Sequence, residues 1–580
     1  MSTQHGMSER HHTTGESGFD ARRLVSPLDA LPIAPAEARL AVSSSLRREC
    51  LVDVSRTVVG HVTHWAEHTP DAVALTDRNG STTYRELARR VAAVRDVLTT
   101  MECGPGAVVA AAGPRGADSV VLLLALESMA LTYLPVDAAW PHDRLARVLR
   151  QSRACHLVSY HREGKSEGLA SAADAVGVPV LDLPSPAELP SNGSPVDLRG
   201  RCEDPGEPRY VYYTSGTTGV PKGALVDHQG MINHLWAKVV DLDLGPADSV
   251  GLTAPLTFDI AIWQMLAPLL VGGRVAALDE RETAFPRTLV TYLQERDVTV
   301  VELVPTVLEW LTNEAEDRPD RNLLRLRCLV STGEELTPQL AGRLLARCPG
   351  ATVVNAYGFT ETSDDVTHHV VLRDDLAHAR LPVGAPVINT VLYVLVAEGG
   401  GWRAARPGES GELFVGGLPP GCGYLDDERA TRSAFFRDTL DPASPTGRLY
   451  RSGDVVTVTD GLLWYVGRRD RQVKVSGVRM ELGEIEAALR RHDAVAECAV
   501  VVVDTAGGDG RALVGHVVPR QGGSITAGEL LSFLRTRLPA AMVPRRWHTH
   551  AVLPVTANGK TDVHALAALS TAGADGADQL

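Results

Sequence analysis

The chain has 580 residues and a formal net charge of −14, from 57 Lys and Arg against 71 Asp and Glu. Hydrophobic residues make up 44% and charged residues 22%, which excludes collagen, a coiled coil and wholesale disorder. The acidic balance argues against a nucleic-acid binder or a basic membrane-surface protein. The longest strongly apolar run, 120–126, is too short to cross a bilayer, and the first twenty residues lack the apolar segment of a secretory signal. We therefore expect a cytoplasmic protein with no nucleic-acid or membrane partner.

Two residue types carry further information. The eight cysteines are scattered, form no CxxC pair and lie beside no plausible His cluster, so we expect reduced thiols of structural or incidental role. Lysine occurs only five times, at Lys165, Lys222, Lys238, Lys474 and Lys560, and Arg carries nearly all the positive charge. A lysine retained in such a chain indicates a place that needs a compact ammonium. Three of the five lie in the motifs described below.

In chain order, residues 1–55 are predicted to form a flexible N-terminal tail with one short helix at 35–46. Helical patterns at 84–98, 117–131 and 141–151 then alternate with apolar runs at 107–112, 156–159 and 178–181, which favours α/β architecture with parallel sheets. Residues 183–207 are predicted to form a connecting segment on the surface. A smaller α+β unit follows the hinge region, with strands predicted at 473–475, 498–503 and 512–518 and helices at 482–491 and 527–537. The predicted domains are a large core at 56–469, a small C-terminal domain at 470–569 and a tail at 570–580.

An anion-binding loop is predicted at residues 210–223, which read YVYYTSGTTGVPKG. A β-prone run enters a loop of hydroxyls and glycines, whose backbone N–H groups can surround phosphate oxygens. Lys222 adds a point charge. The loop is not a Walker A motif, because Gly223 rather than Ser or Thr follows Lys222.

This string resembles the phosphate loop of the adenylate-forming (ANL) superfamily: acyl-CoA synthetases, luciferases and the adenylation domains of nonribosomal peptide synthetases. Other adenylation-domain motifs follow the expected order, namely TYREL at 83–87, YLPVD at 133–137, NAYGFTET at 355–362, GYL at 423–425, YRSGD at 450–454, GRRDRQVK at 467–474 and NGK at 558–560. The resemblance implies a core of αβαβα-layered subdomains with a small β subdomain, and a mobile C-terminal domain. Ser476 departs from the usual Arg, which bears on the second half-reaction.

The resemblance also implies ATP and Mg2+ as cofactors and assigns site residues. Asp470 is the implied hinge, and Glu361 is the implied metal ligand. The implied catalytic residues are Lys560, Glu361, Thr360 and Lys222. The implied ATP-binding residues are Thr214, Ser215, Gly216, Thr217, Thr218, Gly219, Gly333, Asn355, Ala356, Tyr357, Gly358, Asp454, Arg468 and Lys474.

Asp259 matches the aspartate that binds the substrate amino group in amino-acid adenylation domains, which favours an α-amino acid over an acyl or aryl acid. The same register assigns the other substrate-binding positions: Ile260, Trp263, Glu302, Val330, Thr332, Ala356, Asp364 and Asp365. Three carboxylates beyond Asp259 are costly to bury together unless a cation pairs with them. We therefore expect a basic side chain, as in ornithine, arginine or a diamino acid. A small polar amino acid is the alternative.

The predicted function is an AMP-forming, amino-acid adenylating ligase of nonribosomal peptide or antibiotic biosynthesis. No carrier motif follows Leu566 and no condensation motif precedes Thr57, so we expect a free-standing enzyme that loads a peptidyl carrier protein in trans. The resemblance adds a small MbtH-like protein as an optional partner. An acyl- or aryl-CoA ligase and a non-catalytic nucleotide-binding descendant are the rival hypotheses.

Overall fold

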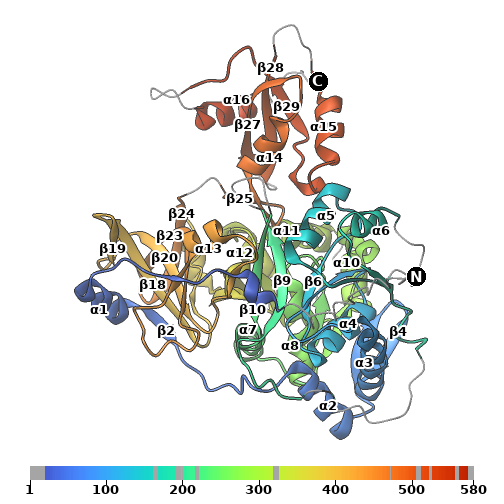
Figure 1. The fold of residues 1–580 in the computed structure, drawn as a ribbon. Helices are drawn as coiled ribbons and strands as arrows, with labels where there is room; N and C mark the ends of the chain where they lie inside the picture. Colours follow the sequence, from blue (N-terminus) through green and yellow to red (C-terminus); the bar gives the residue numbers. More distant parts are fainter. Residues whose placement is uncertain are drawn as a thin grey trace, which may run out of the picture.

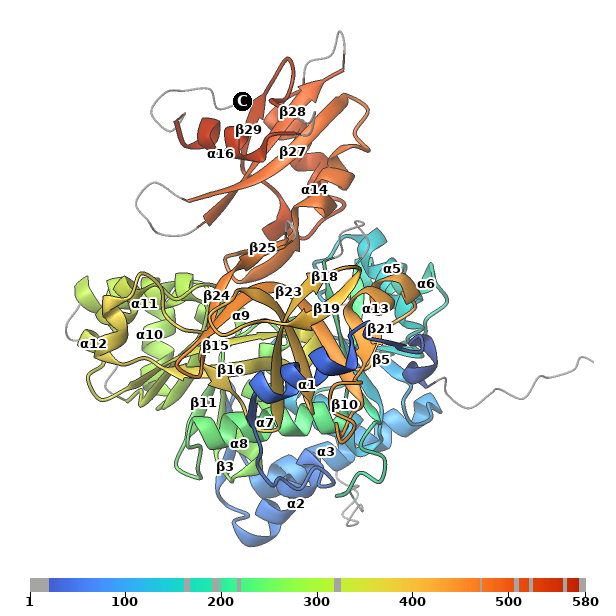
Figure 2. The ribbon, with the colours of Figure 1, turned by 90° about the vertical axis from the view of Figure 1, so that its left-hand side faces the viewer.

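The computed structural model describes residues 20–160, 167–189, 198, 200–215, 221–317, 325–469, 472–504, 511–520, 525–555 and 561–572. A large body formed by the first four fifths of the chain carries a small C-terminal domain on one side, joined through the hairpin that begins with β25 (Figures 1 and 2). This agrees with the predicted α/β class and its division into a large core and a small α+β domain.

Two sheets form the centre of the large body. In the first, most strands run parallel, and its order is β17 (Ala385–Pro386), β16 (Asp364–Val370), β15 (Thr352–Phe359), β14 (Cys328–Ser331), β13 (Val300–Leu303), β11 (Ser249–Leu252), β12 (Arg274–Ala277), β3 (Val73–Asp77) and β4 (Gly80–Thr83). The order of the second is β21 (Gly423–Tyr424), β10 (Lys222–Asp227), β9 (Pro208–Thr214), β6 (Thr132–Pro135), β5 (Val108–Ala112), β7 (His156–Ser159) and β8 (Val180–Asp182).

Helices cover both faces of these sheets. The layer between them consists of α2 (Val58–His68), α3 (Tyr84–Leu98), α4 (Ala117–Ser128), α7 (His228–Asp241) and α8 (Ile260–Leu270). The outer face of the first sheet carries α9 (Glu280–Thr283), α10 (Pro286–Glu295), α11 (Pro305–Asp317) and α12 (Pro338–Arg347), and that of the second carries α5 (His142–Ser152) and α6 (Glu167–Asp174). Alternate residues of a strand therefore enter different cores, as Val109 and Val108 of β5 do, because strand side chains alternate between faces.

A third, mostly antiparallel sheet completes the large body. Its order is β1 (Asp29–Ala30), β22 (Phe435–Arg437), β23 (Arg448–Thr459), β20 (Gly411–Gly417), β18 (Thr390–Glu398) and β19 (Gly401–Ala404), with β2 (Leu46–Arg48) beside β18 and β24 (Leu462–Arg468) beside β23. Helices α1 (Pro35–Ser44) and α13 (Glu428–Ala434) and the short 3-10 turns η1 (Ala21–Leu24), η2 (Thr99–Met101), η3 (Thr360–Thr362) and η4 (Arg373–Ala377) complete the body.

The N-terminal segment corrects one prediction. Residues 20–48 are not a free tail, because β1 pairs with β22 and β2 pairs with β18. Helix α1 packs on the same sheet through Ala41, which is buried. Residues 1–19 lie outside the described residues.

The C-terminal domain has its own core. The hairpin of β25 (Gln472–Val475) and β26 (Val478–Glu481) leads into α14 (Leu482–Leu489), followed by β27 (Val495–Asp504), β28 (Arg511–Pro519), α15 (Ala527–Arg535), η5 (Ala540–Met542), β29 (Arg546–Thr549) and α16 (Val563–Ala572). Helix α16 extends past the predicted start of a tail at 570, since Ser570 is buried and bonded to His516.

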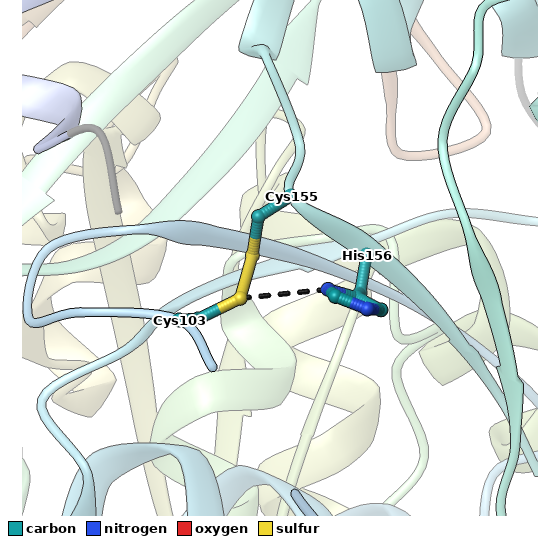
Figure 3. A group of neighbouring side chains, drawn as sticks. All are labelled: Cys103, Cys155 and His156. Atoms are coloured by element: carbon teal, nitrogen blue, oxygen red, sulfur yellow. Dashed lines mark hydrogen bonds between the residues drawn. A yellow bond between two sulfur atoms is a disulfide. The ribbon is translucent and has the colours of Figure 1, made fainter. Parts of the chain in front are cut away.

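Two cysteines also differ from the prediction. Cys103 and Cys155 form a disulfide, and the Nδ1 atom of His156 lies 3.5 Å from Cys103 Sγ (Figure 3). The expectation of reduced thiols is therefore wrong for this pair. Among the described residues, no helix has the length and apolar character needed to cross a membrane.

Candidate functional site

The first group of predicted ATP-binding residues meets where β15 approaches β23 and β24. The Tyr357 hydroxyl donates to Asp454 Oδ2 at 2.6 Å, and Arg468 forms an ion pair with the same carboxylate. Burial raises the pKa of Asp454, although the positive charge of Arg468 opposes this shift. The Asn355 amide donates to the Pro382 carbonyl oxygen at 2.8 Å. An aromatic ring, an amide and a carboxylate together can hold a base and a sugar.

Neighbouring positions of β15 explain part of this geometry. Ala356 is buried beside Tyr357. Gly358 is required by packing, because any Cβ at this position would clash with the Asp364 carbonyl oxygen of β16. The sequence motif therefore keeps a glycine where two strands approach closely.

The second group surrounds Glu361, which follows β15 in turn η3. The Tyr424 hydroxyl donates to Glu361 Oε1 at 2.7 Å, and the Arg479 guanidinium donates to Glu361 Oε2 at 2.7 Å. Burial raises the pKa of Glu361, but the charge of Arg479 and the hydrogen bonds outweigh it and leave that pKa below its usual value. The Lys222 ammonium lies 5.6 Å from the Tyr424 ring centre. One cation, Arg479, is thus paired with the predicted metal ligand, and Lys222 lies beside the tyrosine that also contacts it.

Arg479 comes from the C-terminal domain, whose β25–β26 hairpin reaches into the site. The Ser215 hydroxyl donates to the Arg479 carbonyl oxygen at 3.2 Å. At the hairpin turn, the Gly477 N–H donates to Glu334 Oε1 at 2.8 Å, close to Gly333, whose φ is +84°. A second contact joins the domains away from the site, where Arg144 lies 3.3 Å from Glu484.

Glu361 does not fit a divalent cation in this arrangement of the domains. Its two oxygens are engaged by a hydroxyl and a guanidinium, and a metal ion there would be repelled by Arg479. The residue type suits Mg2+, which binds proteins through few carboxylate oxygens. Metal binding at Glu361 would require Arg479 to withdraw.

Asp259 connects the nucleotide residues to the side-chain pocket. It opens α8, where its Oδ1 accepts the Ile260 N–H at 3.1 Å. Burial raises its pKa, while the Thr360 side chain and the charge of Lys474 oppose this shift. Lys474 interacts electrostatically with both Asp259 and Asp454, and burial together with Arg479 lowers its own pKa. The site therefore places a carboxylate beside cations that suit an anionic substrate.

The predicted pocket contains a cation that the sequence analysis did not assign. Lys238 of α7 is fully buried, and its ammonium lies 2.9 Å from Glu302 Oε2 and 2.5 Å from Asp365 Oδ2. It also lies 4.7 Å from the ring centre of Trp263. The premise that the pocket carboxylates lack a protein cation is therefore wrong for Glu302 and Asp365. Thr332 is also brought into the cluster, donating to Asp365 Oδ1 at 3.3 Å.

The sequence did contain a weak signal for this residue. Lys238 is one of two lysines that no motif contains, in a chain that otherwise uses Arg. The structure also adds Arg479, His234 and His368, which no pattern singled out. Several predicted residues lie outside the described residues: Gly216, Thr217, Thr218, Gly219, Asp470 and Lys560. Thr214 ends β9 and Val330 lies in β14.

Comparisons with known proteins identify the family of this chain. Residues 62–425 match the family described as AMP-binding enzyme, and residues 484–560 match its AMP-binding enzyme C-terminal domain. The chain belongs to the AMP-binding enzyme family. Its relatives and structural neighbours make it an adenylation domain of the ANL superfamily.

Two relatives are synthetases that are much longer than this chain. It is 37% identical over 510 residues to phosphinothricin tripeptide synthetase PhsB of Streptomyces viridochromogenes, covering 86% of this chain and 41% of that protein. It is 31% identical over 520 residues to enterobactin synthase component F of Escherichia coli, covering 88% and 39%. The chain thus spans less than half of either relative.

The structure of holo-PA1221, described as an NRPS protein containing adenylation and PCP domains, superposes with a TM-score of 0.75 at 28% identity. That match covers 89% of this chain and 84% of the other.

Proposed function

We propose that this adenylation domain activates an α-amino acid with ATP, releasing pyrophosphate, and then passes the aminoacyl group to the phosphopantetheine thiol of a carrier protein. One observation supports this more than any other. Asp259 lies beside Thr360 and within the electrostatic field of Lys474, between the nucleotide residues and the side-chain pocket. A carboxylate in that position suits an α-ammonium, which an acyl or aryl acid lacks.

In the first half-reaction, a carboxylate oxygen of the amino acid attacks the α-phosphorus of ATP. The bond from that phosphorus to the bridging oxygen breaks, and pyrophosphate leaves with the electron pair. Two anions must approach each other, so catalysis consists of positioning and charge neutralisation. Tyr357 and Asp454 would hold the nucleoside, and Lys222, Thr360 and Lys560 would stabilise the developing charge.

In the second half-reaction, the carrier thiol loses its proton to solvent and its sulfur attacks the aminoacyl carbonyl carbon. The bond from that carbon to the phosphate oxygen breaks, and AMP leaves with the electron pair. The β25–β26 hairpin occupies the site in this structure, with Arg479 on Glu361 and Gly477 on Glu334. We assign this arrangement to the transfer step, since Lys474 and Arg479 then neutralise the phosphate side of the site. Lys560 would replace the hairpin for adenylation, with Asp470 as the hinge.

Related structures support the substrate and partner classes. Holo-PA1221 is described as containing adenylation and PCP domains, and holo-AB3403 as bound to AMP and glycine. The latter superposes with a TM-score of 0.64 at 28% identity. An AMP site, an amino-acid substrate and a carrier protein are accordingly part of the proposal. The basic side chain expected from the sequence is not carried forward, because Lys238 already neutralises the carboxylates that motivated it.

Amino-acid-dependent exchange of labelled pyrophosphate into ATP tests the proposal. Purified protein is assayed with single α-amino acids, with the matching acids that lack the amino group, and with no acid. We expect exchange with at least one amino acid and little with its desamino counterpart. Exchange with desamino acids followed by transfer to coenzyme A would support the acyl-CoA ligase alternative. A folded protein that exchanges with no acid would support a non-catalytic descendant.

A further inference from the structure

Two of the pocket carboxylates, Glu302 and Asp365, belong to a series of ion pairs that begins in the protein interior. Lys238 lies between Glu302 and Asp365, and all three side chains are almost completely buried. Burial lowers the pKa of Lys238, but the two carboxylates outweigh it and hold that pKa above its usual value. Lys238 is therefore charged, since removing the proton would leave two buried carboxylates without a counter-ion.

This series of ion pairs continues from Asp365 to the protein surface. The ring nitrogens of His368 lie 3.4 Å from Asp365 Oδ2 and 2.7 Å from Asp241 Oδ2. Burial lowers the pKa of His368, but its hydrogen bonds to the two carboxylates leave it raised. Arg48 of β2 then donates to Asp241 Oδ1 at 2.7 Å. Three acidic side chains thus alternate with three basic ones, so Glu302 and Asp365 already have basic partners inside the protein.

Asp364, the remaining carboxylate of the side-chain pocket, lies outside this series and contacts His234. Burial, with Asp365 and Asp259 nearby, raises the pKa of Asp364 well above its usual value. Its Oδ2 lies 3.2 Å from His234 Nε2, and burial lowers the pKa of that histidine to about 3. Asp364 and His234 therefore form a neutral contact at neutral pH.

We propose that Lys238 is a specificity-determining residue, which acts as the internal counter-ion of the side-chain pocket and makes it accept an amino acid with an uncharged side chain and reject cationic ones. The inference rests on the proposed function, because the pocket positions are assigned from the resemblance to adenylation domains. A cationic side chain in the pocket would lie close to Lys238, which already pairs with Glu302 and Asp365, and the two like charges would repel each other. An anionic side chain would meet the carboxylate of Glu302 and the acid of Asp364.

Exchange of Lys238 for methionine tests this directly, because methionine keeps the length and removes the charge. Glu302 and Asp365 then lack their cation, so an ammonium on the substrate can take its place. We expect wild-type protein to exchange pyrophosphate with uncharged amino acids and only weakly with lysine, ornithine, arginine and 2,4-diaminobutyrate. In Lys238→Met the ratio of kcat/KM for the best cationic substrate to that for the best uncharged one should rise about 10- to 150-fold, the value of a charge-assisted hydrogen bond.

Three further variants separate a charge effect from damage to the fold. In Lys238→Met combined with Glu302→Gln and Asp365→Asn, the ratio should stay at the wild-type value, because no carboxylate is left without a partner. Arg432→Met removes an exposed cation that pairs with Asp29 and Glu428 and should change nothing. If Lys238→Met does not fold, Glu302→Gln serves instead. This variant removes one of the two carboxylates that pair with Lys238 and leaves part of the lysine charge uncompensated. It should raise the ratio of kcat/KM for aspartate or glutamate to that for the uncharged substrate.

The outcomes are distinct. A wild-type preference for a cationic amino acid would overturn the inference and leave the adenylation proposal standing. Equal loss for all amino acids in folded Lys238→Met, with an unchanged ratio, would give Lys238 a structural role only and would also overturn it. Wild-type protein that exchanges with no amino acid at all would overturn the proposed function itself.

Discussion

Replacing Asp259 with asparagine tests the residue on which the amino-acid assignment depends. The exchange removes one negative charge at nearly constant volume, and asparagine Oδ1 can still accept the Ile260 N–H that begins α8. The fold should therefore be retained. A charge-assisted hydrogen bond to the α-ammonium is worth roughly 1.5–3 kcal/mol, so kcat/KM for the amino acid should fall roughly 10- to 150-fold.

The assay is pyrophosphate exchange with the preferred amino acid and with the matching acid that lacks the amino group. Only the amino acid should lose activity in Asp259→Asn, so the preference for the amino group should shrink. The KM for ATP should stay constant, because Tyr357 and Arg468 rather than Asp259 contact the Asp454 carboxylate. Asp460→Asn is the matched control: this residue is exposed in a turn with φ of +52°, which asparagine tolerates. Equal losses for both acids would refute the assignment of Asp259 to the amino group.

Of four other predictions, the first rests on the NGK motif at 558–560 and the other three on the structure. Lys560→Ala should nearly abolish pyrophosphate exchange while circular dichroism and the melting temperature stay unchanged; normal exchange would remove this lysine from the mechanism. Arg479→Met leaves Glu361 without its cation and should reduce loading of a carrier protein supplied in trans more than exchange; equal losses would argue against a role in the transfer step. The pKa of His368 is higher in the folded protein than its value of about 6.5 in the unfolded chain, so protonated His368 stabilises the fold at low pH. This contribution is lost as the pH rises through the folded pKa. The free energy of unfolding of His368→Gln, measured with urea, should therefore depend less on pH in that range. Reducing the Cys103–Cys155 disulfide, which joins residues 52 positions apart, should cost about 4 kcal/mol and lower the melting temperature, whereas a variant with serine at both positions should not respond to reductant.

Local patterns predicted the regular elements well. The helix expected at 84–98 is α3 (Tyr84–Leu98), because Thr83 caps it by accepting the Glu86 N–H and its apolar residues recur on one face. The strand expected at 156–159 is β7. The helix expected at 117–131 ends earlier, at Ser128, because the chain turns at Ala130 with a φ of +59° to enter β6. That turn depends on where the next strand pairs, which periodicity does not contain.

Contacts between distant segments were not predictable in the same way. Residues 20–48 have weak periodicity, and they are ordered because their short strands pair with β22 and β18, which lie several hundred residues further along the chain. The Cys103–Cys155 pair likewise joins the loop before β5 to the start of β7, through the parallel pairing of those strands.

The sequence by itself determined the family and the chemical types of the site residues, because the motifs are long, ordered and rich in groups that bind anions. It also showed that several carboxylates would be buried together. Only the tertiary structure decided how their charges are balanced. Lys238 is 64 residues from Glu302 and 127 from Asp365 along the chain, and helix packing against the sheet brings its ammonium within 3 Å of both. Electrostatic pairing in a protein interior depends on distances of this size, so the net charge of a pocket follows from packing and not from the composition of its lining.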